Sequence, residues 1–167
     1  MRLLVLATLS FSIGCTYDFD SYLPASGADA GRTDTGTTTD GGGGTCSEAG
    51  SKTYNGHCYF PTSKPAPFAD AKAACEAAGA HLVTVGSGGE ESIVESIGSG
   101  DRWLGLSRSP GTPSRADSFK WITGEPMSYL RWGGSQPSGA GECGRVRSFG
   151  SWGDANCSDT LIGICER

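Results

Sequence analysis

The chain has 167 residues, with 19% charged residues and a formal net charge of −5, a size that suits one domain with accessory segments. The acidic balance argues against a general nucleic-acid-binding protein, because such a protein needs a basic face to engage phosphates. The seven cysteines favour an oxidising compartment and a fold held together by disulfide bonds.

The first fourteen residues have the pattern of an export signal. Arg2 precedes an apolar run from Leu3 to Ile13 that is too short for a permanent membrane span. The run leads to Gly14 and Cys15, and a small residue before a cysteine resembles the bacterial lipoprotein box, in which the thiol is diacylglycerated and the cysteine becomes the first residue of the mature chain. We therefore predict a signal peptide over 1–14 and lipidation at Cys15. This would make the protein a bacterial cell-envelope lipoprotein, held at a membrane by its lipid anchor only.

Ordinary cleavage before Cys15 is the alternative, because Ser12 stands where the lipoprotein box usually has leucine. That alternative gives a secreted protein with a free thiol at its start. Cysteine parity favours lipidation, since an unpaired thiol is a liability in an exported protein.

Residues 15–45 are expected to link the lipidated cysteine to a domain. The segment is rich in Gly, Thr and Asp and too poor in apolar residues to form a core, so it predicts a flexible tether. The remaining cysteines all lie within 46–167, an even set that predicts a disulfide-stapled domain. Spacing alone leaves the pairing open, and the absence of any Cys-x-x-Cys pair disfavours a zinc site.

Two helices are expected early in the domain. Phe68, Ala71 and Cys75 recur at helical spacing, and Gly79 supplies a stop where the chain can take a positive φ. A second helix is predicted at about 89–97, with acidic residues at its start that favour the helix dipole.

Strands are expected mainly in the second half. The predicted strands cover 81–85, 102–106, 118–122, 144–149 and 161–166. Arg145 and Arg147 alternate along one of them, which is typical of side chains that face solvent. Between 107 and 160, many Gly, Ser and Pro residues with little regular pattern predict a long loop region, and such loops are commonly functional. The fold class is therefore α+β.

Several motifs within 46–167 resemble the long form of the C-type lectin-like fold. They are the cysteine-bounded segment from Cys46 to Phe60, the helical run Phe68–Cys75 with Gly79–Val83, Trp103-Leu-Gly-Leu106, Phe119-Lys-Trp121, Trp132, and the C-terminal set Cys143, Trp152, Cys157 and Ile164–Glu166. The resemblance covers essentially all of 46–167. It implies two helices, small antiparallel sheets, a long loop region and three disulfides, Cys46–Cys58, Cys75–Cys165 and Cys143–Cys157.

The resemblance also implies a ligand site in the long loop. Sugar-binding members hold a Ca²⁺ there that coordinates sugar hydroxyls directly, and Ca²⁺ needs several oxygen ligands. The corresponding positions, implied as calcium ligands and as ligand-binding residues, are Gln136, Ser138, Glu142 and Asp154. Three features depart from the pattern: Ser138 replaces Asn or Asp, Gly153 replaces Asn, and the segment from Gln136 to Cys143 is shortened.

The tryptophans have different expected roles. Trp103, Trp121 and Trp152 are expected in the core, because large aromatics dominate small cores. Trp132, beside Gly133 and Gly134, is expected to expose part of its ring for stacking on a sugar.

Two functions follow. The first is a surface-anchored module that recognises carbohydrate through about 124–156, with calcium as the candidate cofactor. The alternative is a calcium-independent C-type lectin-like domain that binds a surface protein, as the eroded ligand set suggests. Catalysis is not expected, since the domain shows no Ser/His/Asp order and no metalloprotease motif.

Overall fold

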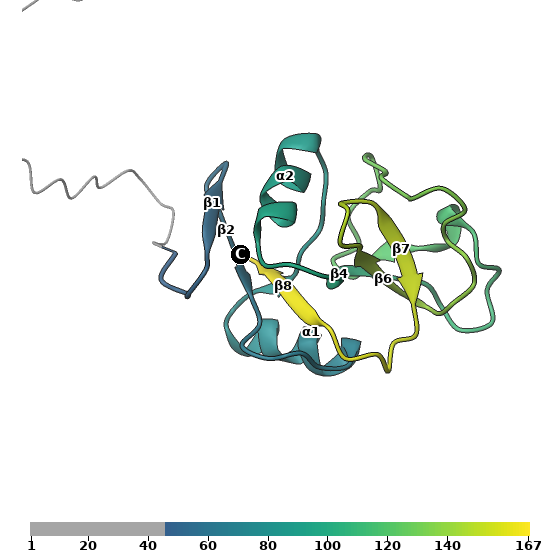
Figure 1. Ribbon diagram of the computed structural model, residues 1–167, viewed down its shortest axis with the longest axis horizontal. Coiled ribbons are helices and arrows are strands. Elements are labelled where there is room, and N and C mark those ends of the chain that lie inside the picture. The colour runs from purple at the N-terminus through teal and green to yellow at the C-terminus, as the bar shows by residue number, and fades with distance from the viewer. Residues whose placement is uncertain (1–45) are drawn as a thin grey trace, which may run out of the picture. The chain divides into compact units, whose positions relative to one another are not determined.

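The computed structural model describes residues 46–167 (Figure 1), and all structural statements below concern this part of the chain. The predicted signal peptide, Cys15 and the tether lie outside the described residues. Within 46–167, neither helix has the length and apolar character needed to cross a membrane.

The domain opens with an antiparallel hairpin of β1 (Lys52–Tyr54) and β2 (His57–Pro61). Its two-residue turn is Asn55-Gly56, and both residues have a positive φ, of 50° and 83°. Asn-Gly is favoured in such turns because these residues tolerate the left-handed region. β2 then pairs with β8 (Ile162–Glu166), which brings the two ends of the domain together.

The two predicted helices are confirmed. α1 (Phe68–Ala77) buries Phe68, Ala71 and Cys75, and the chain turns away at Gly79 with a φ of 69°. α2 (Gly88–Ser96) begins after Ser87, whose hydroxyl accepts a hydrogen bond from the backbone N–H of Glu90 at 3.2 Å. This N-cap satisfies one of the free N–H groups of the first helical turn.

The strands form a mixed sheet in the order β1-β2-β8-β4-β6-β7, in which β3 also pairs with β8 and β5 with β4. The remaining elements are β3 (His81–Leu82), β4 (Arg102–Ser107), the short 3₁₀ helix η1 (Ala116–Ser118), β5 (Lys120–Trp121), β6 (Cys143–Val146) and β7 (Trp152–Ala155). β4 and β8 are parallel, and the other pairs are antiparallel. The α+β class is confirmed.

Strand lengths differ from the sequence prediction. The strand expected over 81–85 is hydrogen-bonded as β3 only at 81–82, although Val83 and Val85 are buried. The one expected over 118–122 is β5 alone, because η1 takes the residues before it. The one expected over 144–149 ends at Val146, where a tight turn begins.

β7 was not predicted, and it lies inside the region expected to be irregular. Its four residues do not alternate between apolar and polar side chains, and Gly153 has low strand propensity. The strand forms because the chain reverses at Gly150, which has a φ of 81°, and pairs with β6 from Cys143↔Ala155 to Val146↔Trp152. Tertiary pairing therefore creates an element that local sequence does not indicate.

The disulfides are Cys46–Cys58, Cys75–Cys165 and Cys143–Cys157, the pairs that the resemblance implies. They use every cysteine within 46–167. Cys75–Cys165 joins α1 to β8 across 90 residues of sequence. In the chain-entropy model, closing a loop of this length stabilises the fold by about 4–5 kcal/mol.

β4 lies in the middle of the sheet, and its Gly105 is a close-approach position. The N–H of Gly105 donates to the carbonyl of Val83 at 2.8 Å, and the carbonyl oxygen of Leu82 lies directly against its Cα. A Cβ at this position would overlap that backbone oxygen. The glycine of the Trp103-Leu-Gly-Leu106 motif is therefore required by packing of the chain against β4.

We expect Gly105→Ala to lower the free energy of unfolding by about 2 kcal/mol or more, because the backbone at Leu82 must move to admit the methyl group. The measurement is urea denaturation of the oxidised protein. Gly134→Ala is the matched control, since a Cβ there meets no atom within 4 Å. Equal stability of the two variants would contradict this account of Gly105.

Candidate ligand-binding site

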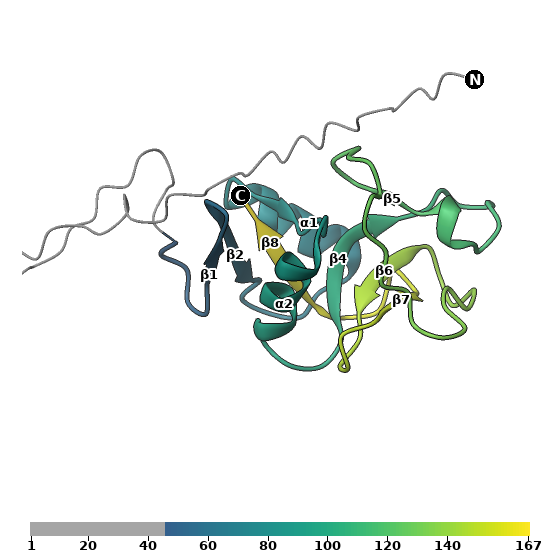
Figure 2. The same ribbon diagram turned by 90° about the horizontal axis from the view of Figure 1, so that it is seen from above.

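The long loop region lies at the end of the domain away from the β1–β2 hairpin (Figures 1 and 2). It comprises the chain between β4 and β6 together with the turn between β6 and β7. The segment 131–133 runs beside β7, with the N–H of Trp152 donating to the carbonyl of Arg131 at 2.7 Å and the N–H of Gly133 donating to that of Trp152 at 2.9 Å. The loop is thereby attached to the sheet along one edge.

An aromatic cluster anchors this loop. Trp152 is fully buried, and its ring centroid lies 5.3 Å from that of Trp121, 5.9 Å from that of Tyr129 and 6.2 Å from that of Trp132. Trp103 is also buried, so the core placement predicted for these tryptophans is confirmed.

Trp132 occupies an intermediate position. It is partly exposed, but its ring packs edge-on against Phe119 with centroids 4.9 Å apart, and its Nε1 is buried without a hydrogen-bond partner among the described residues. Much of the Trp132 ring therefore packs inside the domain, where it holds the long loop in place.

A buried carboxylate ties the cluster to α2. Glu91 is 1% exposed, and its Oε2 accepts a hydrogen bond from Trp152 Nε1 at 2.8 Å. Burial raises the pKa of Glu91 to about 7, against the lowering effects of the Trp152 hydrogen bond and of Arg131. Sequence reasoning treated Glu91 as an acidic residue serving the helix dipole. The structure turns it inward, where it binds the loop-anchoring tryptophan.

Asp154, on β7, organises the segment from Ser138 to Gly141. Its Oδ1 accepts hydrogen bonds from the N–H and the hydroxyl of Ser138, at 2.6 and 2.9 Å. Its Oδ2 accepts from the N–H groups of Gly139 and Gly141, at 2.7 and 3.3 Å. Burial raises the pKa of Asp154, but these hydrogen bonds outweigh it and the net pKa lies below the usual range.

Gln136 and Gly153 meet beside Asp154. The Gln136 amide oxygen accepts a hydrogen bond from the N–H of Asp154 at 3.2 Å, and the Gln136–Pro137 peptide bond is cis. A Cβ at Gly153 would lie 2.9 Å from that amide oxygen and 3.1 Å from Cδ of Arg147. The space that an asparagine side chain would need at position 153 is thus filled by Gln136 and Arg147.

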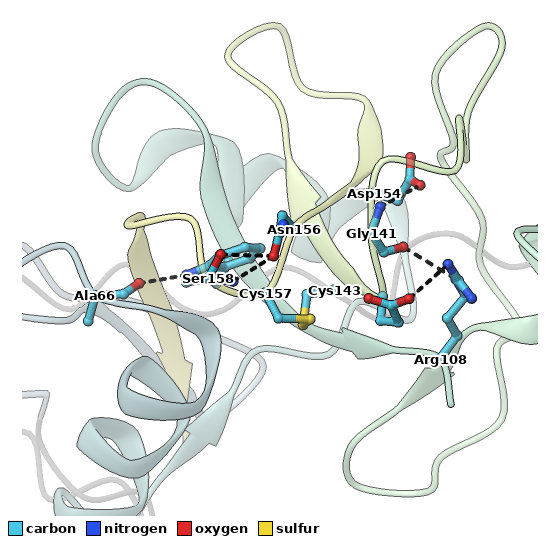
Figure 3. Close-up of a disulfide and its surroundings, with 10 residues drawn as sticks. Ala66, Arg108, Gly141, Cys143, Asp154, Asn156, Cys157 and Ser158 are labelled. Carbon is cyan, nitrogen blue, oxygen red and sulfur yellow. Dashed lines mark hydrogen bonds and ion pairs between the residues drawn. A yellow bond between two sulfur atoms is a disulfide. The ribbon is translucent and has the colours of Figure 1, made fainter. Parts of the chain in front are cut away.

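Glu142 faces a different partner. Its Oε1 lies 3.2 Å from Nη2 of Arg108, and Nε of Arg108 donates to the carbonyl of Gly141 at 3.2 Å (Figure 3). The Cys143–Cys157 disulfide lies beside this pair in Figure 3 and holds the ends of β6 and β7 together. The structure thus brings Gln136, Ser138 and Asp154 into direct contact and directs Glu142 to Arg108.

Comparison with known proteins defines the family. The model of the lectin C-type domain matches residues 64–167. The chain belongs to the C-type lectin domain family. Lithostathine of Bos taurus is 32% identical over 131 residues, which cover 71% of this chain and 75% of that protein.

Solved C-type lectin structures share the fold. The carbohydrate-recognition domain of the mouse scavenger receptor C-type lectin has a TM-score of 0.64 and 28% identity, covering 71% of this chain and 94% of that one. The cow CD23 domain, solved in the presence of a GlcNAc2Man3 oligosaccharide, has a TM-score of 0.64 and 25% identity, covering 74% of this chain and 95% of that one. This C-type lectin domain is a binding module and not an enzyme.

The residues at the family's calcium position do not fit Ca²⁺ in this C-type lectin domain. A calcium-binding carboxylate needs free oxygen lone pairs, whereas both oxygens of Asp154 accept from N–H donors whose positive ends oppose a cation. Gly153 supplies no side-chain oxygen, and Glu142 is paired with Arg108. Within 46–167, no group of three or more His, Cys, Asp or Glu side chains is arranged to hold a metal.

The stability of this C-type lectin domain should depend on pH through Glu91. The pKa of Glu91 is about 7 in the folded state, above the ordinary value of 4.5, so the folded protein binds its proton more tightly. Its contribution to stability is therefore full below pH 4.5 and is lost as the pH rises through about 7. As the pH rises from 4.5 to about 7, we expect the free energy of unfolding of Glu91→Gln to increase by on the order of 3 kcal/mol relative to that of wild type.

The measurement is chemical denaturation of wild type and Glu91→Gln at a series of pH values. Glu76→Gln is the matched control, because Glu76 is an exposed glutamate of the other helix, paired only with Lys72. Parallel stability curves for wild type and Glu91→Gln would contradict the role given to Glu91.

Proposed function

We propose that this C-type lectin domain recognises carbohydrate outside the cell, through the face formed by the β6–β7 turn and residues 132–138, and does so without calcium. The observation that carries the proposal is Phe149, which is 93% exposed at the tip of the β6–β7 turn. Sugar sites combine an aromatic surface with a few placed polar groups. The Gln136 amide, the Ser151 hydroxyl and the Arg147 guanidinium lie close together around Gly133 and Gly153, and Phe149 lies between Arg147 and Ser151 in the chain.

Family membership supports the carbohydrate assignment, since relatives include the human asialoglycoprotein receptor 2 and domains named for carbohydrate recognition. The donors around Asp154 support independence from calcium. They give that carboxylate the partners that a metal ion would otherwise provide, so the loop holds its conformation through hydrogen bonds.

The test is binding of the oxidised full-length protein to a glycan panel, in Ca²⁺ and again in EDTA. We expect binding that is equal in the two buffers, and no shift of the melting temperature on adding Ca²⁺, because an ion that binds the folded state would raise it. We expect Phe149→Ala to weaken binding roughly fivefold through loss of apolar contact with the sugar ring.

Leu130→Ala is the matched control, because Leu130 is the other large apolar side chain that is exposed in the described domain, at 56%. It should leave glycan binding unchanged. Binding that disappears in EDTA would overturn calcium independence, and a Phe149→Ala variant that binds like wild type would overturn the location of the site.

A second candidate is binding of a protein partner, which the surroundings of Leu130 favour. A pocket of about 320 Å³ is lined by Phe119, Met127 and Leu130, with Asp117 and Lys120 at its side. Such an apolar pocket suits an aliphatic or aromatic side chain of a protein better than a sugar. A glycan panel without signal in either buffer would favour this second function.

We also propose that the chain is exported and carries its lipid on Cys15. The apolar run that ends at Gly14 supports this, and so does the pairing of every cysteine within 46–167 into disulfides. The domain would then be displayed at the bacterial envelope on residues 16–45.

Metabolic labelling with a radioactive fatty acid in a bacterial host tests this anchor. We expect the full chain to take up the label and to partition into detergent, and Cys15→Ser to do neither, because the diacylglyceryl group that carries the acyl chains is bonded to the Cys15 sulfur. Label retained in Cys15→Ser would contradict the assignment, and an unlabelled wild-type protein in the medium would favour simple secretion.

A further inference from the structure

Arg147 lies in a cradle made by two glycines at the proposed site. A Cβ at Gly133 would be 3.2 Å from Nη1 of Arg147, and a Cβ at Gly153 would be 3.1 Å from its Cδ. A Cβ at either position would also lie 2.9 Å from Ser151 Oγ or from Gln136 Oε1, so a larger residue would crowd all three side chains. The absence of side chains at these positions therefore allows the guanidinium to lie close against the loop, half buried beside Gln136 and Ser151.

Arg147 differs from the other surface arginines in lacking an acidic partner. Arg145 pairs with Asp101 at 2.8 Å, so the solvent-facing placement expected for it is only part of its role. The remaining pairs are Arg108 with Glu142, Arg115 with Asp117, Arg131 with Glu95, and Arg167 with Glu48. Within 46–167, no carboxylate lies within 4.0 Å of Arg147, and its side chain makes no hydrogen bond.

The nearest carboxylate of the site does not neutralise Arg147. Asp154 is 1% exposed, and both its oxygens are occupied by donors of the segment from Ser138 to Gly141. The cation is therefore presented at the surface together with an amide and a hydroxyl. A planar guanidinium matches an oxyanion through two parallel hydrogen bonds, which makes arginine the preferred residue for such groups.

We propose that this site binds an acidic saccharide, whose carboxylate or sulfate group pairs with Arg147 while sugar hydroxyls meet Gln136 and Ser151. The inference rests on the proposed carbohydrate-binding function and adds the chemical class of the sugar. The positive charge that a calcium ion would provide is supplied here by the protein itself. The site then selects its ligand by negative charge, and not by coordination of sugar hydroxyls to a metal ion.

The experiment uses multivalent conjugates of glucuronic acid, of sulfated glucose and of neutral glucose, each tested in EDTA against the full-length protein. Multivalent display compensates for weak single sites. We expect the acidic conjugates to bind at least tenfold more tightly than glucose, and binding to weaken as salt is raised. Arg147→Gln should remove this preference with little change in the melting temperature, because the Arg147 side chain makes no ion pair or hydrogen bond within 46–167 and glutamine keeps the first part of the side chain.

Two comparisons sharpen the test. Arg167→Gln is the control, since Arg167 is an arginine paired with Glu48 and packed over Phe60 of β2, and it should bind like wild type. Arg147→Lys should retain only part of the binding to glucuronic acid, because an ammonium lacks the two-pronged geometry. Binding to only one of the two acidic conjugates supports the proposal and identifies whether carboxylate or sulfate is recognised.

Equal binding of acidic and neutral conjugates that survives Arg147→Gln would overturn this inference and leave carbohydrate recognition standing. Failure of all three conjugates, together with an empty glycan panel, would overturn both.

Discussion

The hydrogen bond from Trp152 to Glu91 is the constraint on which the long loop, and with it the proposed ligand-binding face, depends. It joins β7 to α2 in the core, and the ring that donates it is also the centre of the aromatic cluster that holds the long loop. Segment 131–133 is hydrogen-bonded to the backbone of Trp152. Asp154, two residues after Trp152, accepts hydrogen bonds from the segment between Ser138 and Gly141. A loop with little regular structure is thereby fixed by one buried tryptophan and two carboxylates.

The surroundings of the two carboxylates favour opposite charge states: those of Glu91 favour the protonated form, and those of Asp154 favour the ionised form. Glu91 is buried with one strong donor, and its other oxygen has no hydrogen-bond partner in the described domain and only Arg131 at 4.0 Å, so its charged form is costly. Asp154 is equally buried, but four hydrogen bonds from Ser138, Gly139 and Gly141 stabilise its charge. The loop can keep its shape in this way without a metal, because backbone amides stabilise the negative charge of the carboxylate.

Local sequence patterns predicted the elements whose structure depends on residues close together in the sequence. Helix α1 followed from the spacing of Phe68, Ala71 and Cys75, and its end followed from Gly79. β7 was missed because its pairing with β6 depends on a turn at Gly150 and on no pattern of its own. At the site, Gln136 and Ser138 contact Asp154 in the structure, and their role as ligand-binding residues stays a prediction. The partners of Glu91 and Glu142 come from distant segments, so no local pattern indicates them.

The entry of the chain into the domain has a mechanical consequence. Cys46 is bonded to Cys58, only 12 residues away, and β2 pairs with β8, which is itself bonded to α1 through Cys75–Cys165. A pull applied through the preceding residues would reach β2 through the first disulfide and bypass the β1 strand and its turn. Tension would then be carried by β2 and its pairing with β8. The Asn55-Gly56 turn would stay folded, because it lies outside the path of the load.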